Sequence, residues 1–279
     1  MKVALIQQHA GPDKSINLAR GLAAARQAAA DGAQVIAFAE LAFEPFYPQI
    51  PASEQTWAEN VKDLAEEIPG PTTEVFQALA RELEVVIILN LYERDGERAF
   101  DTSPVIDADG TLLGLTRMVH ITEYETFHEQ GYYDHGDRGA PVYATRFGSI
   151  GVAICYDRHF PEYMRALALA GADVIFIPQA GALGEWPEGL YEAELRVTAF
   201  QNGVFTALCN RVGKESRLTF GGESFVCNPN GAVIARAQAG TDEVLHVELD
   251  LTLAESSHAR QLFMRDRRPE LYSAWLGPS

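Results

Sequence analysis

The chain of 279 residues is poor in cysteine and in basic residues. Its three cysteines, Cys155, Cys209 and Cys227, are odd in number and far apart. We therefore expect free thiols in a reducing cytoplasm rather than a disulfide framework. Acidic residues outnumber basic residues by 39 to 22, giving a net charge of −17. A surface this negative repels phosphate groups, so neither nucleic acid nor an anionic membrane is an expected partner.

Long apolar runs and cofactor motifs are also missing. No apolar segment approaches the roughly 20 residues that span a bilayer. Residues 1–7 lack the longer apolar core and the cleavage site of a signal peptide, and they read as a strand. The chain has no Cys-x-x-Cys pair, no His-Glu-x-x-His motif and no glycine-rich nucleotide-binding motif. We therefore expect no metal site and no cofactor.

What the chain does contain is the pattern of an α/β protein. It is 47% hydrophobic and 22% charged, which is typical of a globular protein, and its length suits one large domain covering residues 1–279. Short apolar runs predict buried strands that alternate with helical patterns, the first helix capped by Ser15. We expect strands at 1–7, 35–39, 85–89, 150–154, 174–177 and 204–208, helices at 15–31, 72–84, 161–171 and 188–201, and antiparallel strands at 224–226, 233–235 and 244–249.

Cys155 is the strongest candidate for a reactive residue. It follows an apolar strand and precedes a helix that Pro161 opens. A thiol at such a joint faces backbone N–H groups and the positive end of a helix dipole, a setting that favours the thiolate and provides donors for an oxyanion. The alternative is an inert buried cysteine, and this is our interpretation of Cys209 and Cys227, which lie within apolar strand patterns.

A nucleophilic cysteine needs a base. Glu40 is one candidate, since it ends the strand at 35–39 and α/β folds gather catalytic groups at the carboxyl ends of strands. It could equally be a salt-bridged carboxylate. The residues alone leave the choice open between Glu40 and four histidines, His120, His128, His135 and His159.

Several segments of the chain resemble the carbon–nitrogen hydrolase (nitrilase) superfamily, in the family's order. They are residues 38–41, 120–121, 151–162, 210–213, 222–231 and 265–272. The resemblance implies an α/β fold built as a four-layer αββα sandwich, and dimers that join two sandwiches. We expect the C-terminal segment 251–279 to contribute to contacts in a homodimer or higher homo-oligomer. The resemblance also implies a Glu–Lys–Cys triad with a second glutamate, and no cofactor.

Position by position, Cys155 matches the family's nucleophile and Glu40 its general base. Glu129 matches the second glutamate, which helps to orient the substrate, and the backbone N–H of Tyr156 would donate to the oxyanion. The implied reaction is attack on an amide or ureido carbon, loss of ammonia or an amine, and hydrolysis of the acyl-enzyme by water activated at Glu40.

Met118 departs from the family pattern, because it occupies the position of the triad lysine. A thioether donates no hydrogen bond, and loss of one oxyanion donor typically lowers the rate by about 10²–10³. Without the cation, the pKa of nearby carboxylates should also rise. Three interpretations remain: a substitution made to trap a substrate, a natural protein with weak or altered activity, or replacement by Arg117, the weakest because neighbours on a strand face opposite ways. Asp101, where relatives often carry asparagine, is a smaller departure.

The pair Arg158–His159 after the cysteine resembles branches that act on N-carbamoyl amino acids, including β-ureidopropionases. In those branches the pair binds the substrate carboxylate, and arginine suits bidentate capture. Arg158 could equally pair with a neighbouring carboxylate. Gln179 ends a strand near the same rim. We expect the substrate to be an N-carbamoyl amino acid (a ureido acid) or a small amide, cleaved with release of ammonia. The alternatives are an aliphatic amidase or nitrilase, and a catalytically impaired homologue that binds small molecules or partners.

Overall fold

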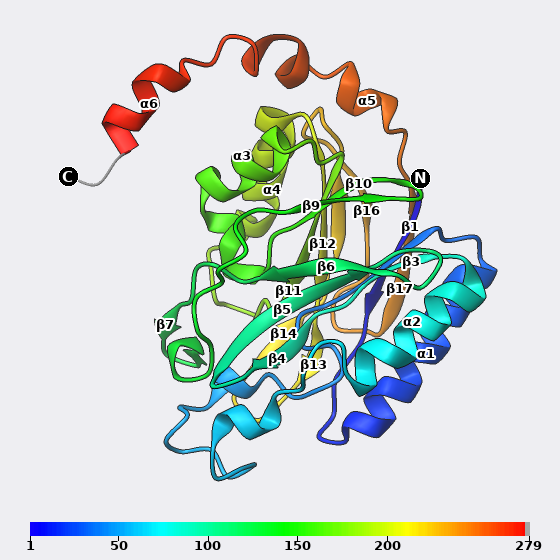
Figure 1. Ribbon diagram of the computed structural model, residues 1–279, viewed down its shortest axis with the longest axis vertical. Helices are drawn as coiled ribbons and strands as arrows, with labels where there is room; N and C mark the ends of the chain where they lie inside the picture. The colour runs from blue at the N-terminus through cyan, green and yellow to red at the C-terminus, as the bar shows by residue number, and fades with distance from the viewer. Residues whose placement is uncertain (277–279) are drawn as a thin grey trace.

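The computed structural model describes residues 1–276, which form two sheets and their flanking helices (Figure 1). The first sheet has the order β17-β1-β2-β3-β5-β4, with β6 paired to β5. Its strands are β1 Lys2–Gln7, β2 Val35–Phe38, β3 Val86–Ile88, β4 Leu91–Asp95, β5 Arg98–Ile106, β6 Leu112–Arg117 and β17 Glu243–Glu248.

The second sheet has the order β16-β15-β12-β11-β10-β9, and two short hairpins stand apart from both sheets. Its strands are β9 Val142–Thr145, β10 Gly148–Val152, β11 Val174–Gln179, β12 Phe205–Asn210, β15 Phe225–Cys227 and β16 Val233–Arg236. The hairpins are β7 Glu123–Tyr124 with β8 Phe127–His128, and β13 Val212–Lys214 with β14 Thr219–Gly221.

Four longer helices flank the sheets, and short helical turns lie in the loops. The α-helices are α1 Lys14–Ala30, α2 Pro71–Leu83, α3 Pro161–Leu169, α4 Leu190–Asn202, α5 Thr252–Glu255 and α6 Pro269–Leu276. The short turns are η1 Tyr47–Gln49, η2 Val61–Leu64, η3 Glu129–Gly131, η4 Cys155–His159 and η5 Ala259–Phe263. Within the described residues, none of these helices has the length and apolar character needed to cross a bilayer.

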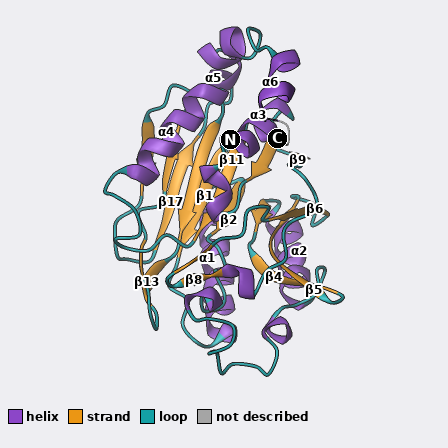
Figure 2. Ribbon diagram, turned by 90° about the vertical axis from the view of Figure 1, so that its left-hand side faces the viewer, coloured by secondary structure: helices purple, strands orange, loops and turns teal. Residues whose placement is uncertain are grey.

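Alternation along the central strands builds the layers. In β1, Val3 and Leu5 pack into the core between the sheets, whereas Ala4 and Ile6 face α1 and α2. In β11, residues 174 and 176 join the same central core, and 175 and 177 face α3 and α4. Because successive side chains point to opposite faces, each buried strand contributes to two cores. The predicted αββα sandwich is confirmed, and Figure 2 shows the strands lying between the helices.

The predicted strands and helices are found, with shifts at their ends. Ser15 does not cap α1: Asp13 does, and its carboxylate accepts from the N–H groups of Ser15 and Ile16. Asp13 stands before the first helical residue with an extended backbone, the geometry of a capping residue. Helix α4 begins at Leu190 because Gly189 has a φ of +80°, outside the helical region.

The C-terminal residues leave the body of the molecule. Figure 1 shows η5 and α6 running as an arm beyond the sheets. The arm exposes apolar side chains, including Trp275, which is 68% exposed. We expect the segment 251–279 to contribute to oligomer contacts. The last three residues of this segment lie outside the described residues.

Candidate active site

Cys155 occupies a sharp turn between β10 and α3. The strand ends at Val152, and Cys155 opens the short helix η4 with a φ of +44°. A residue other than glycine in this region is strained by about 1–3 kcal/mol, and such strain clusters at functional sites. The side chain is 4% exposed, so a tight turn at the predicted position holds a buried thiol.

Two glutamates converge on this thiol. Glu40 follows β2 of the first sheet, and Glu129 opens η3 in the loop after β8. One ligand atom from each of Glu40, Glu129 and Cys155 lies within 4.8 Å of the others. The predicted convergence of Cys155 and Glu40 at one rim is therefore found. Among the described residues, these three can also hold a metal ion by geometry.

Burial controls the titration of this group. It raises the pKa of Glu40 well above the ordinary value, and the neighbouring carboxylates Asp101 and Glu129 raise it further. Burial likewise raises the pKa of Glu129 and of the Cys155 thiol. The expectation that the turn favours a thiolate is wrong, because desolvation and two carboxylates outweigh the helix start. The thiol rests protonated, and a base must accept its proton during attack.

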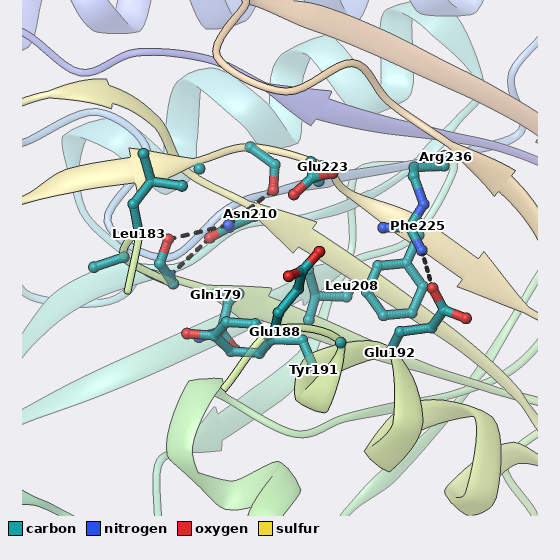
Figure 3. A pocket seen from close by; sticks show the side chains of 15 residues that line it. Gln179, Leu183, Glu188, Tyr191, Glu192, Leu208, Asn210, Glu223, Phe225 and Arg236 are labelled. Carbon is teal, nitrogen blue, oxygen red and sulfur yellow. Dashed lines mark hydrogen bonds and ion pairs between the residues drawn. The ribbon is translucent and has the colours of Figure 1, made fainter. Parts of the chain in front are cut away.

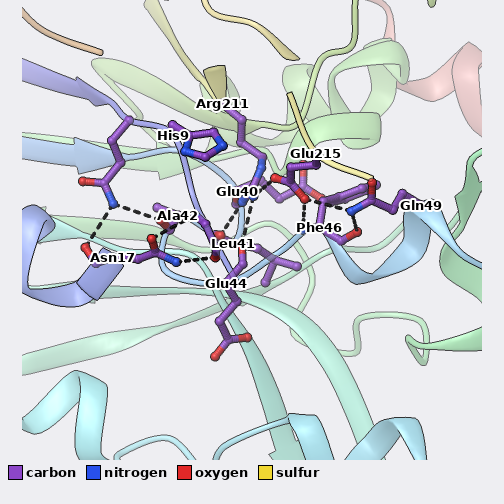
Figure 4. A network of polar contacts seen from close by, with 12 residues as sticks. His9, Asn17, Glu40, Leu41, Ala42, Glu44, Phe46, Gln49, Arg211 and Glu215 are labelled. Atoms are coloured by element: carbon purple, nitrogen blue, oxygen red, sulfur yellow. Dashed lines mark hydrogen bonds and ion pairs between the residues drawn. The ribbon is translucent and has the colours of Figure 1, made fainter. Parts of the chain in front are cut away.

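A buried arginine holds the loop that carries Glu40 (Figure 4). Arg211 donates from Nη1 to the carbonyls of Glu40, at 2.8 Å, and Leu41, and from Nη2 to the carbonyl of Glu44, at 2.9 Å. Its position, one residue beyond β12, brings the second sheet to the loop of the first. Sequence reasoning assigned Arg211 no role, although residues 210–213 were part of the family resemblance.

A hydrogen-bonded chain from the first sheet reaches Leu41, the residue directly after Glu40. The Leu41 N–H donates to Asn90 Oδ1 at 2.8 Å, and Asn90 Nδ2 donates to Asp101 Oδ1 at 2.5 Å. The Asp101 carboxyl lies near enough to Glu40 to raise the pKa of that carboxyl group, although neither oxygen of Glu40 has a hydrogen-bond partner among the described residues. Burial raises the pKa of Asp101 to about 7. Asn90 was missed from the sequence, since an asparagine after a strand carries no distinguishing pattern.

Glu129 is fixed by its own loop. Its Oε2 accepts from the N–H of Thr122 at 3.1 Å, while Oε1 is buried without a hydrogen-bond partner. The hydroxyl of Tyr133 is also buried without a hydrogen-bond partner. Burial raises the pKa of this phenol, and the nearby Glu40 and Glu129 raise it further. Glu129 therefore presents one free oxygen to the site.

Met118 lies in the predicted place, directly after β6. Its side chain is fully buried in the core cluster that contains Cys155. Its neighbour Arg117 points elsewhere: the guanidinium bonds Glu93 at 2.6 and 2.8 Å, Asp95 at 2.8 Å and Asp137 at 2.9 Å. Arg117 is thus committed to three carboxylates, and the interpretation that it replaces the lysine does not fit this geometry.

The Arg158–His159 pair lies behind the cysteine and is largely engaged. Arg158 Nη1 donates to the Cys155 carbonyl at 2.8 Å and to Gln179 Oε1 at 2.7 Å, while Nη2 is buried without a partner. His159 Nδ1 is 2.6 Å from an oxygen of Glu194. Tyr156, which directly follows Cys155, packs its ring against that of His159 with 5.2 Å between the ring centroids, and its N–H lies in the first turn of η4.

The other candidate histidines are held away from the thiol. His120 Nδ1 bonds the buried Asp157 at 2.7 Å, and its ring stacks on Phe160. The remaining two are likewise paired, His128 with Glu123 at 2.7 Å and His135 with the Val119 carbonyl at 3.0 Å. Of the candidate bases, the structure brings Glu40 to Cys155.

A pocket of about 340 Å³ has Gln179 in its lining, whereas Glu40, Glu129 and Cys155 do not line it (Figure 3). Tyr191 forms part of its wall and lies over Arg158, with the guanidinium carbon 4.6 Å from the ring centroid. The lining has an acidic excess, three glutamates against one arginine that itself pairs with Glu192 at 2.5 Å. The charged lining residues are Glu188, Glu192, Glu223 and Arg236.

Comparison with known proteins agrees with this geometry. The family model "Carbon-nitrogen hydrolase" matches residues 2–259. N-carbamoylputrescine amidase of Arabidopsis thaliana is 35% identical over 98% of this chain and 94% of its own, and β-ureidopropionase of the same plant is 33% identical over 79% and 57%. The crystal structure of a carbon–nitrogen hydrolase from Helicobacter pylori matches with a TM-score of 0.90 and 28% identity, covering 99% of this chain and 98% of that one. The chain therefore belongs to the carbon–nitrogen hydrolase family of the nitrilase superfamily.

Proposed function

We propose that this chain hydrolyses the C–N bond of a small ureido or amide compound through a covalent intermediate on Cys155. The observation that carries the proposal is the convergence of a strained, buried thiol with Glu40 and Glu129 within 4.8 Å. A carboxylate with a raised pKa next to a thiol suits transfer of a proton in both directions near neutral pH. Glu40 is the general base, and Glu129, with its free oxygen, orients the substrate.

The reaction begins when the sulfur attacks the carbonyl carbon and Glu40 accepts the thiol proton. The C–N bond then breaks, and the proton on Glu40 passes to the leaving nitrogen, which departs as ammonia or an amine. A water molecule gives a proton to Glu40 and attacks the thioester, and the sulfur leaves with that proton to restore the thiol. Over the whole reaction one proton passes to the leaving nitrogen and one is taken from water, so the Glu40–Cys155 pair ends with the proton that it had at the start.

The developing oxyanion needs donors, and the Tyr156 N–H in the first turn of η4 is one. Met118 supplies none. The expected consequence is a turnover about 10²–10³ below that of an enzyme with a second, charged donor. If the loss of turnover is complete, the chain is a catalytically impaired homologue.

The acidic pocket favours a substrate with a neutral or cationic end, such as a carbamoylated amine. Among the described residues, Glu188 and Glu223 on its wall form no ion pair, whereas Glu192 pairs with Arg236. Two of the relatives, the N-carbamoylputrescine amidase and the β-ureidopropionase, act by name on ureido compounds.

A second candidate, an N-carbamoyl amino acid, has one observation in its favour. Arg158 Nη2 is buried and has no partner, so it can donate to a carboxylate that enters beside Cys155. Its neighbour Nη1 is already bonded to Gln179 and the Cys155 carbonyl. A carboxylate bound at Nη2 would therefore leave in place the two bonds that Nη1 makes.

The test is ammonia release from four probes: a carbamoylated diamine, a carbamoyl β-amino acid, an aliphatic amide and a nitrile. The wild-type chain is compared with Met118→Lys and with Cys155→Ala as the blank. We expect turnover of the carbamoylated amine by the wild type, increased by Met118→Lys. If neither protein releases ammonia from any probe, the proposed hydrolysis is wrong.

We also propose that the C-terminal arm contacts a second copy of the chain. Its exposed apolar residues, Trp275 among them, support this assignment. Sedimentation of the full chain and of Trp275→Glu tests it: a dimer that the substitution weakens is expected, and a monomer at all concentrations would contradict it.

A further inference from the structure

Glu185 lies in the loop between β11 and α4 and bonds two tyrosines that belong to different elements. Its Oε1 accepts from the Tyr124 hydroxyl at 2.6 Å. Its Oε2 accepts from the Tyr191 hydroxyl and, at 3.1 Å, from the N–H of Ala182 in its own loop. Hydrogen bonds to a carboxylate are roughly twice as strong as those between neutral groups. The carboxylate therefore ties the two tyrosines to each other and to this loop.

The Tyr124 end of the network leads to Glu129. Tyr124 pairs with Phe127 across the hairpin β7–β8, and their rings stack with 4.9 Å between the centroids. Strand β8 runs directly into η3, whose first residue is Glu129. A shift of Tyr124 would therefore move the segment that carries Glu129.

The Tyr191 end leads to Cys155. Tyr191 stands in the first turn of α4, and the guanidinium carbon of Arg158 lies 4.6 Å from the centroid of its ring. Arg158 Nη1 in turn donates to the carbonyl of Cys155 at 2.8 Å. Cys155 has a φ of +44°, a strained conformation that persists only where the surrounding structure enforces it. The ring of Tyr191 and the guanidinium that lies on it form part of that support.

Two glycines make the loop dependent on the Glu185 carboxylate. Gly184 and Gly189 have φ values of +77° and +80°, and a Cβ at either position would meet no atom within 4 Å beyond the chain neighbours. Glycine leaves the backbone freer than any other residue does. Between these glycines, the side-chain hydrogen bonds among the described residues are those of Glu185, because the indole N–H of Trp186 is buried without a partner. Loss of the carboxylate should therefore release the loop and both tyrosines.

We propose that Glu185 is a positioning residue that clamps the hairpin β7–β8 to α4 and thereby sets the separation between Glu129 and Cys155. This inference rests on the proposed function of these two residues. A substrate oriented by Glu129 must meet the sulfur of Cys155 at bonding distance, and a misplacement of about 1 Å can lower the rate about 10²-fold. The clamp therefore acts on kcat more than on KM.

The experiment compares kcat and KM of wild type, Glu185→Ala, Glu185→Gln and the control Glu82→Ala, each on a carbamoylated diamine and on a neutral aliphatic amide. The control removes an exposed glutamate of α2 that pairs with Arg26 at 2.5 Å. In Glu185→Ala, kcat should fall about 10–100-fold on both substrates, with KM within about threefold of the wild-type value. Control constants should equal those of the wild type.

Glu185→Gln is the conservative variant that should restore the clamp. Its side-chain carbonyl can accept from Tyr191 and Ala182, and its amide can donate to the Tyr124 hydroxyl. We therefore expect its kcat to stay within about threefold of the wild-type value on both substrates.

A Glu185 that instead binds the cationic end of the substrate predicts a raised KM for the diamine in both variants and unchanged constants for the amide. That result would overturn the inference, as would a Glu185→Ala kcat equal to that of the control. If Glu185→Ala does not fold, Tyr124→Phe decides, because it keeps the ring and removes one bond of the clamp. Its kcat should fall about threefold or more, and a wild-type kcat would contradict the clamp.

If no protein releases ammonia from either substrate, the proposed function fails, and amide hydrogen exchange then decides the inference. In Glu185→Ala, or in Tyr124→Phe if the former does not fold, the peptides that contain Glu129 and Cys155 should exchange about tenfold faster than in wild type and control. Faster exchange confined to the loop 180–189 would show a local structural role and would refute the clamp.

Discussion

Replacement of Asp101 by asparagine should stabilise the protein at alkaline pH. The folded chain raises the pKa of Asp101 from 3.8 to about 7, mainly through burial. Between these values the folded state binds a proton that the unfolded state has lost, so stability falls as the pH rises. The contribution is complete below pH 3.8 and is lost above about 7. Each pKa unit corresponds to 1.36 kcal/mol, so the loss amounts to at most about 4 kcal/mol.

Asparagine preserves the shape and the bond from Asn90, but it has no proton to lose. The difference in unfolding free energy between Asp101→Asn and wild type should therefore grow by up to about 4 kcal/mol between pH 4 and pH 8. Urea denaturation followed by circular dichroism at intervals of one pH unit measures it. The matched control is Asp63→Asn, which removes an exposed carboxylate that pairs with Arg94. A difference constant within about 1 kcal/mol across this range would refute the reasoning, because a carboxylate ionised in both states gives no slope.

Three further changes test other parts of the site. Glu40→Gln keeps the shape of the base but accepts no proton, so kcat should fall by about 10²–10⁴ with KM little changed; near-normal kcat would contradict its role. Arg211→Ala leaves three loop carbonyls without their donor and the buried Glu215 without its positively charged partner, and urea denaturation should report a loss of unfolding free energy of about 3–5 kcal/mol. The pair Glu188→Gln and Glu223→Gln should raise KM for a carbamoylated diamine about tenfold and leave KM for a neutral amide unchanged; equal effects on both would contradict the charge argument.

Much of the architecture follows from local patterns in the sequence. Buried strands such as β2 and β11 are continuous apolar runs, and helices such as α2 begin at a proline and carry an apolar face. The turn at Cys155 was predicted from a strand followed closely by Pro161. These features depend on residues that are close together in the sequence, so the sequence alone predicts them. The four-layer arrangement itself came from the family resemblance.

The electrostatics of the site did not follow from local pattern. The thiol pKa was expected to fall, because a helix start is visible in sequence while the burial of Glu40 and Glu129 beside it is not. Likewise, Asp101 read as a minor departure from relatives, and its effect on the pKa of Glu40 arises only when β5 is placed near the loop after β2. Arg211 and Asn90 act on backbone carbonyl and N–H groups across sheets, a role that no spacing rule reveals.

The central claim is that Cys155 carries the acyl group during C–N cleavage. Mass spectrometry of the wild-type chain, quenched during incubation with a carbamoylated amine and digested, tests it most directly. The account predicts a mass increase equal to the acyl portion on the peptide that contains Cys155, and none on the peptides of Cys209 and Cys227. Turnover that continues in Cys155→Ala, or an adduct on either of the other thiols alone, would contradict it.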